Sequence, residues 1–180
     1  GVSRGLGDVY KRQINIREGD VLLEAKLTTG NSHVMLAVRS GKAIRFEESK
    51  TRPMGRGASG VRGITLKDDK DEVVGMIAVN DMDANILVVS ENGYGKRSSL
   101  DDYRVTNRGG KGIIGIVNSP RNGNISASLV VNEADEIILS TDKGSIMRCA
   151  VKEIRVAGRN TQGVSCLLYT SDAADETEGV

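Results

Sequence analysis

Short apolar runs, each followed closely by a glycine, recur along this 180-residue chain. Residues 34–39, 86–91 and 137–142 are rich in Val, Ile and Leu and end at Ser-Gly, Asn-Gly or Lys-Gly. Such runs predict strands that turn back through tight hairpins, because glycine supplies the positive φ that these turns require. A second strand is predicted after each glycine, and a third after residues 60, 112 and 163. The alternating or apolar stretches 20–27, 72–79 and 124–131 predict a fourth, so we expect an all-β fold.

Residues 34–61, 86–113 and 137–164 align without gaps and define a repeat of about 52 residues. Each copy has a glycine, an arginine four residues later, a second seven further on, a third four beyond that, and a closing glycine. Repeats of this length indicate a propeller-like array, in which each blade packs on its neighbours. Three blades rarely close a ring, so we expect an incomplete disc of about three four-stranded blades, at about 14–66, 72–117 and 124–164.

The distribution of charge changes the interpretation of the low net charge of +1. Residues 41–61, 93–113 and 144–164 each carry +3, so the rest of the chain carries −8. Equivalent positions in stacked blades face the same way, which predicts a basic band around the rim. Such a band binds duplex DNA in a salt-dependent and largely sequence-independent manner. Aromatic residues make up only 3% of the chain, which argues against a stacking platform for single strands.

The repeated arginines fall into two groups by position. Arg45, Arg97 and Arg148 lie next to the hairpins, where pairing within the fold and contact with DNA are both open. The later cations begin or lie within glycine-rich connections, where backbone N–H groups can approach a ligand, and there DNA contact is favoured. The predicted DNA-binding residues are Arg52, Arg56, Lys96, Arg97, Arg104, Arg108, Gly109, Gly110, Lys111, Gly112, Arg155 and Arg159.

The composition predicts neither a catalytic centre nor a metal site. His33 is the single histidine, and Cys149 and Cys166 are too few for a disulfide framework or a zinc site. The stretch TNRGGKGII, residues 106–114, is not a P-loop, because Lys111 is followed by glycine and position 105 is valine. No apolar run reaches the roughly 20 residues of a membrane span and no signal peptide is apparent. We therefore expect a cytoplasmic protein with no membrane partner.

The stretch ENGYGKRSSLDDYRVTNRGGKGI, residues 91–113, closely resembles a blade of the C-terminal domain of the bacterial DNA gyrase A protein. KAIRFEESKTRPMGRGASGVRGI, residues 42–64, and IRVAGRNTQGV, residues 154–164, resemble the blades on either side. The resemblance covers about residues 14–164 and implies the last three blades of a β-pinwheel, whose blades exchange strands and wrap duplex DNA. It also implies part of an ATP-hydrolysing type II topoisomerase that introduces negative supercoils. The catalytic residues, ATP and Mg²⁺ would lie in other domains, with no cofactor here, and the partners would be the rest of gyrase A, together with gyrase B in an A2B2 assembly.

The segment TNRGGKG, residues 106–112, matches the last five residues of that family's signature box, QRRGGKG. The resemblance thus implies that Arg108, Gly109, Gly110, Lys111 and Gly112 form a box-like phosphate loop. The catalytic tyrosine of the family belongs to another domain, so both Tyr94 and Tyr103 are expected to be packing residues. Residues 1–13 and 165–180 fit neither the repeat nor the family and are expected to be non-native sequence.

Two alternatives remain open at this point. The corresponding C-terminal domain of topoisomerase IV has the same fold and guides DNA instead of wrapping it, although NRGGKG and RNTQGV favour gyrase. A propeller could also serve as a protein-interaction platform whose basic band meets an acidic partner. Binding that survives high salt would support that platform, because counterion release predicts a steep loss of DNA affinity.

Overall fold

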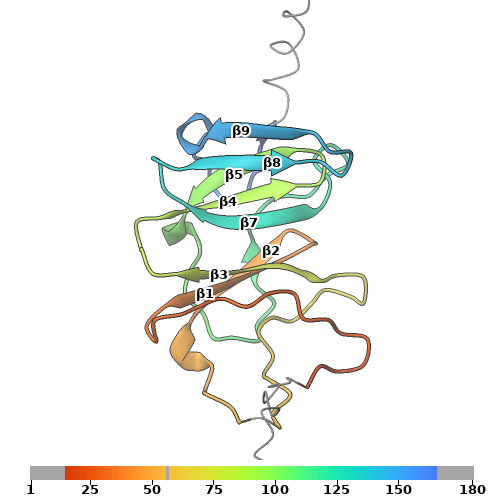
Figure 1. Ribbon diagram of the computed structural model, residues 1–180, viewed down its shortest axis with the longest axis vertical. Helices are drawn as coiled ribbons and strands as arrows, with labels where there is room; N and C mark the ends of the chain where they lie inside the picture. The colour runs from red at the N-terminus through yellow and green to blue at the C-terminus, as the bar shows by residue number, and fades with distance from the viewer. Residues whose placement is uncertain (1–14, 56, 166–180) are drawn as a thin grey trace, which may run out of the picture.

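The computed structural model describes residues 15–55 and 57–165, and within these ranges it contains strands and 3-10 turns but no α-helix (Figure 1). It follows that no helix in the described part of the chain could cross a membrane. The predicted leader, all but the first residue of the predicted tail, and the predicted DNA contact Arg56 lie outside the described residues.

The first sheet has four antiparallel strands in the order β3-β1-β2-β6. Strands β1 (His33–Val38) and β2 (Lys42–Glu47) form the predicted hairpin around Gly41. β3 (Val73–Val79) pairs with the free edge of β1, and β6 (Ile113–Ile114) pairs with β2. Because β6 follows the closing glycine of the second repeat, the second repeat completes the sheet of the first.

The second sheet repeats this plan in the order β10-β5-β4-β7. Its hairpin is β4 (Asn85–Ser90) with β5 (Tyr94–Ser99), β7 (Ile125–Val131) lies beside β4, and β10 (Val164–Ser165) lies beside β5. β10 follows the closing glycine of the third repeat. The all-β fold and the exchange of strands between blades are therefore confirmed.

The grouping of strands corrects the predicted blade boundaries. Residues 72–79 and 124–131 were expected to open the second and third blades, but β3 and β7 complete the first and second sheets. Residues 20–27 and the position of Val61 form no strand. In the described residues the third unit is the hairpin of β8 (Glu136–Ser140) and β9 (Ile146–Ala150) alone. An apolar strand between two hairpins can pair with either, and its pairing is decided by three-dimensional packing that the order of elements does not specify.

Apolar side chains fill the spaces between consecutive units, which are stacked along the long axis of the molecule (Figure 1). Between the two sheets, Met35 and Val79 pack with Ile86, Leu100 and Tyr103. A second cluster joins the second sheet to the third hairpin and consists of Leu87, Val89, Val131, Ile137, Val151 and Ile154. Burial of these side chains provides the main favourable term for packing repeat on repeat. Tyr103 is 1% exposed and is thus a packing residue, as expected.

Each hairpin is followed by a single 3-10 turn, namely η1 (Glu48–Lys50), η2 (Leu100–Asp102) or η3 (Val151–Glu153). After each turn the chain enters the irregular, glycine-rich connection that carries the later cations of the repeat. The fold therefore places equivalent connections at successive interfaces between repeats.

Candidate nucleic-acid interface

The arginine next to the hairpin joins one repeat to the next. Arg45 donates from Nη1 to the carbonyl oxygens of Leu100 at 2.9 Å and Tyr103 at 3.1 Å. Arg97 donates from Nε to the carbonyl oxygen of Ile154 at 2.6 Å. Tyr103 and Ile154 occupy equivalent positions in successive repeats, and both arginines are less than a tenth exposed. These side chains act as forward clamps between repeats, and Arg45 also donates to His33 Nδ1 at 2.9 Å.

The Lys96 side chain is likewise buried and hydrogen-bonded within the fold. Its ammonium donates to the carbonyl oxygens of Gly158 at 2.8 Å and Arg159, and to the Thr161 hydroxyl at 3.2 Å, and the residue is 1% exposed. Burial lowers the pKa of Lys96 from 10.5 to about 8, while the charge of Asp102 opposes that shift and the charge of Arg159 adds to it.

The assignment of Lys96 and Arg97 as DNA contacts is corrected by these positions. A buried cation needs partners within the fold, and both side chains have them. Lysine and arginine are rarely buried to this extent, so the sequence favoured a surface position for both.

Arg148 holds the same repeat position as Arg45 and Arg97 but lies on the surface. Its side chain is 70% exposed and its Nε donates to Glu136 Oε2 at 2.7 Å. The described residues contain no further repeat whose carbonyl oxygens could receive this guanidinium. All three arginines at this position pair within the fold, and contact of the exposed Arg148 with DNA stays a prediction.

In the second and third repeats the third arginine points back to the preceding repeat. Arg108 donates to the carbonyl oxygens of Lys50 at 2.8 Å and Arg62 at 3.2 Å, and Arg159 donates to that of Ile114 at 3.0 Å. Arg62 and Ile114 occupy equivalent positions, so these two arginines are backward clamps. Each remains partly exposed, and the Nη2 groups of both make no hydrogen bond in the described chain.

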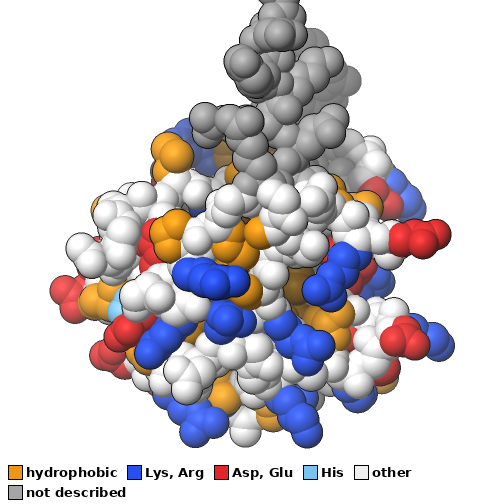
Figure 2. Space-filling view, turned by 90° about the horizontal axis from the view of Figure 1, so that it is seen from below, with side chains coloured by type: hydrophobic (Ala, Val, Ile, Leu, Met, Phe, Trp, Pro, Cys, Tyr) orange, Lys and Arg blue, Asp and Glu red, His pale blue; other side chains and the backbone are white. Residues whose placement is uncertain are grey.

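Four of the predicted contacts are exposed cations whose side chains make no hydrogen bond or ion pair with the described residues, namely Arg52, Arg104, Lys111 and Arg155. Arg104 and Arg155 are repeat equivalents, two residues beyond the 3-10 turns η2 and η3. Figure 2, seen from below relative to Figure 1, shows Lys and Arg gathered over the middle and lower part of that face, with Asp and Glu mainly at its edges.

The box-like segment is held against the first repeat. Thr65 donates from its hydroxyl to the carbonyl oxygen of Gly109 at 2.7 Å and from its N–H to that of Gly110 at 2.8 Å. Gly112 has a φ of +69°, and a Cβ there would lie 2.7 Å from the carbonyl oxygen of Ala43. Glycine is required at that position both by the backbone conformation and by the close approach. Gly110 and Lys111 are exposed at the outer side of this segment.

A small cavity of about 250 Å³ lies beneath this connection. Ile44 lines it together with Arg104, Thr106, Asn107 and the segment 110–113. The sequence did not identify Ile44, Thr106 or Asn107 as site residues, because none of them is charged. A comparison of the third residue after each hairpin glycine would have distinguished Ile44 from Lys96 and Met147.

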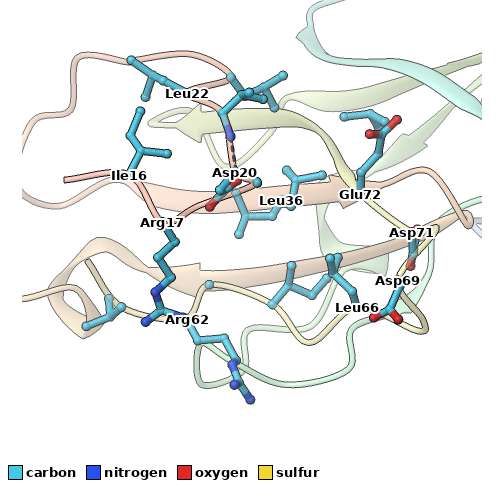
Figure 3. Close-up of a pocket in the computed structure, with 18 of the residues that line it drawn as sticks. Ile16, Arg17, Asp20, Leu22, Leu36, Arg62, Leu66, Asp69, Asp71 and Glu72 are labelled. Atoms are coloured by element: carbon cyan, nitrogen blue, oxygen red, sulfur yellow. Dashed lines mark hydrogen bonds between the residues drawn. The ribbon is translucent and has the colours of Figure 1, made fainter. Parts of the chain in front are cut away.

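A larger cavity of about 1230 Å³ lies between the segment 15–23 and the first sheet (Figure 3). Apolar and charged residues both line it, with Leu22 and Leu36 among the apolar ones and Arg62 and Asp69 among the charged ones. In the described residues no group of three or more His, Cys, Asp or Glu side chains could hold a metal ion. Burial and the charge of Glu153 raise the pKa of the Cys149 thiol, which disfavours the reactive thiolate.

A family model described as "DNA gyrase C-terminal domain, beta-propeller" matches residues 32–80, 84–132 and 135–179. The chain belongs to this family. The first matched segment of the gyrase domain contains β1, β2 and β3, and the second contains β4, β5, β6 and β7. The segments agree with the structure in placing β3 and β7 with the preceding hairpins, whereas β6 lies in the second segment but completes the first sheet.

Curated relatives and solved structures agree with this assignment to the gyrase family. The chain is 43% identical over 159 residues to the DNA gyrase A protein of Salmonella typhimurium, covering 88% of this chain and 18% of that protein. It is 44% identical over 154 residues to the DNA gyrase A protein of Chlamydia trachomatis, covering 85% and 18%. The chain therefore spans about 18% of the length of these relatives.

Two solved structures superimpose equally well. A DNA gyrase A C-terminal domain has a TM-score of 0.78 at 27% identity, covering 84% of this chain and 52% of that chain. The C-terminal domain of a DNA topoisomerase IV has a TM-score of 0.78 at 28% identity, covering 84% and 48%. The resemblance to the gyrase A domain is confirmed, and the relation to topoisomerase IV is one of fold.

Proposed function

We propose that this part of gyrase A binds and wraps duplex DNA through cations on the connections between repeats. The observation that carries the proposal is that the side chains of Arg104, Lys111 and Arg155 are exposed and unpaired in the described chain, while the hairpin arginines Arg45 and Arg97 are buried. Unpaired cations on irregular, glycine-rich backbone suit phosphate contacts, which position a duplex without reading its sequence. Their attraction for phosphates offsets the few kcal/mol that bending 20–30 base pairs costs, on the order of 1–6 kcal/mol for smooth bending.

The clamps give this surface its spacing. Arg45 and Arg97 hold each hairpin to the next repeat, and Arg108 and Arg159 hold each connection to the preceding one. Cations on neighbouring repeats therefore keep a defined separation without ordering flexible segments on binding. Such pre-organisation favours binding because less conformational entropy is lost.

The wider role follows from the family. In a whole cytoplasmic gyrase, wrapping by this domain would support ATP-dependent negative supercoiling, together with the rest of gyrase A and with gyrase B. Catalytic residues, ATP and Mg²⁺ would belong to those other parts, and this segment would contribute no catalysis of its own. Guiding DNA, as expected for a topoisomerase IV domain, is the alternative that uses the same cations.

A salt titration of duplex binding tests the proposal. The 180-residue chain is compared with the triple variant R104A/K111A/R155A on a duplex of about 40 base pairs, long enough to contact more than one repeat. Loss of three phosphate contacts should flatten the slope of log affinity against log salt by about 3. The matched control K67A/K70A/K143A removes three exposed cations outside the connections and should leave the slope unchanged.

Equal flattening in both triple variants would show that binding follows total charge and would contradict the proposed surface. A folded chain that does not bind duplex at low salt would overturn the DNA-binding role. A protein-interaction platform for an acidic partner would then be the better explanation of the exposed cations.

A further inference from the structure

The two interfaces between repeats differ in the residue beneath the connection. Ile44, Lys96 and Met147 are each the third residue after a hairpin glycine and are therefore equivalent. At the second interface the Lys96 ammonium fills the space under the connection and donates to Gly158, Arg159 and Thr161. At the first interface Ile44 has no donor to offer, and the cavity of about 250 Å³ lies above it.

Cationic, polar and apolar residues all line this cavity. Arg104 and Lys111 contribute charged groups that make no hydrogen bond or ion pair with the described chain. Asn107 and Gly110 complete the wall, and Ile44 provides an apolar floor. The cavity is several times the roughly 30 Å³ that one water occupies in the liquid, so it has room for a phosphate group. An arginine and a lysine together supply both a planar fork of donors and a mobile point charge for phosphate oxygens.

We propose that this cavity is a phosphate-binding site that takes one phosphodiester group of the bound duplex. The equivalent space at the second interface is occupied by Lys96 from the protein itself and takes none. The proposal rests on the proposed DNA-binding function and adds to it that the two interfaces hold DNA in different ways. Arg155 at the second interface then contacts phosphate from the surface only.

A single exchange of side chains separates this site from general electrostatic attraction. I44K places an ammonium beneath the first connection, where the carbonyl groups of Asn107 and Arg108 are equivalent to the two that receive Lys96. Total charge predicts tighter DNA binding by I44K, because a cation is added. If the introduced ammonium occupies the cavity in place of a phosphate, DNA binding is weaker in spite of the added cation.

Duplex affinity and its salt slope are measured for the wild-type chain, I44K, I44M and K96M, with thermal melting of each variant as a control for folding. I44K should weaken binding about fivefold and flatten the slope by about 1, as expected for one lost phosphate contact. I44M introduces the residue of the third repeat and should bind as the wild type does. Tighter binding by folded I44K would overturn the site.

K96M keeps the proposal testable if I44K does not fold, because it leaves the first interface unchanged. It removes the ammonium from the second space, so its affinity should be unchanged or higher despite the lost cation. Weaker binding by folded K96M would overturn the proposal.

Titration with inorganic phosphate distinguishes the sources of the ligand, with the backbone amides of Gly110 and Lys111 followed by NMR. Saturable shifts that I44K abolishes are expected. If they occur in a wild-type chain that binds no duplex, the proposed function fails and the site belongs to free phosphate. If the wild type binds duplex but phosphate causes no shift and I44K binds normally, the site fails and the proposed function stands.

Discussion

The two interfaces between repeats are held by equivalent arginines but differ in what lies beneath the connection. In both, the hairpin arginine reaches forward to a carbonyl oxygen, and the backbone bridges Arg45 with Val105 and Arg97 with Val156. At the first interface a cavity lies over Ile44, whereas at the second interface the Lys96 ammonium fills the equivalent space. The comparison teaches that a repeated cation can hold the array together at one position and remain free for a ligand at another. Repetition alone does not distinguish these roles.

In the third repeat, the described chain has no following repeat that could pack on the equivalent arginine. Arg97 is 5% exposed, but the side chain of Arg148 is 70% exposed. The difference arises from the neighbouring repeat, because the packing of residues 151–157 against β5 is what buries Arg97.

The largest expected effect is on stability, from removing a forward clamp. R97A should lower the free energy of unfolding by about 3 kcal/mol, since it leaves the carbonyl oxygen of buried Ile154 without its charged donor. R148A removes the same residue type from an exposed pair and should cost less than about 0.5 kcal/mol. Urea denaturation of both variants measures the difference. Similar losses would contradict the distinction between a buried clamp and a surface pair.

A smaller effect is expected from the closing glycines. G112A combines a φ of +69° with a Cβ only 2.7 Å from the carbonyl oxygen of Ala43, so backbone must shift, at a cost of about 2–3 kcal/mol. At the second interface G163A meets Gly95 at 3.0 Å and should cost somewhat less.

The hairpin glycine Gly144, with a φ of +90° and nothing within 4 Å of a Cβ, serves as the control for backbone conformation. G144A should cost about 1–2 kcal/mol from its left-handed backbone alone. Thermal or urea unfolding of the three variants tests this order. A G144A variant as destabilised as G112A would show that contact between repeats adds nothing to the requirement for glycine.

A pH dependence of stability is expected from Lys96 at the second interface. The pKa of Lys96 is lowered to about 8 by burial, whereas an unfolded lysine titrates near 10.5. Between these values the unfolded chain binds more protons, so the stability of the wild type relative to K96M should rise as pH increases from about 8 to 10.5. Below pH 8 the difference should be constant.

Denaturant titrations across this range measure the effect, with K111M as a control for loss of an exposed lysine. A wild type that loses stability relative to K96M over the same range would show that the ammonium is favoured by its surroundings. That result would contradict the assignment of Lys96 as a desolvated cation.

Much of the fold was predictable from local chemistry. The hairpins around Gly41, Gly93 and Gly144 were found because β-branched runs and glycines act over a few residues. The grouping of β3 and β7 with the preceding hairpins was not predicted, since pairing of distant strands depends on the packing of whole sheets. The two-residue strands β6 and β10 were predicted by position, but their partners in the preceding sheet became known only from the resemblance and the structure.

The repeat, the turns and the places where cations recur can be read from the chain, because these depend on residue type and spacing. Which of the cations are available to a ligand depends on the three-dimensional packing of the repeats. Whether a long side chain such as that of Lys96, Arg97 or Arg148 is desolvated depends on the carbonyl groups that a neighbouring repeat brings to it. Those carbonyl groups lie more than 50 residues away in the chain from Lys96 and Arg97, and no local pattern around a cation records them.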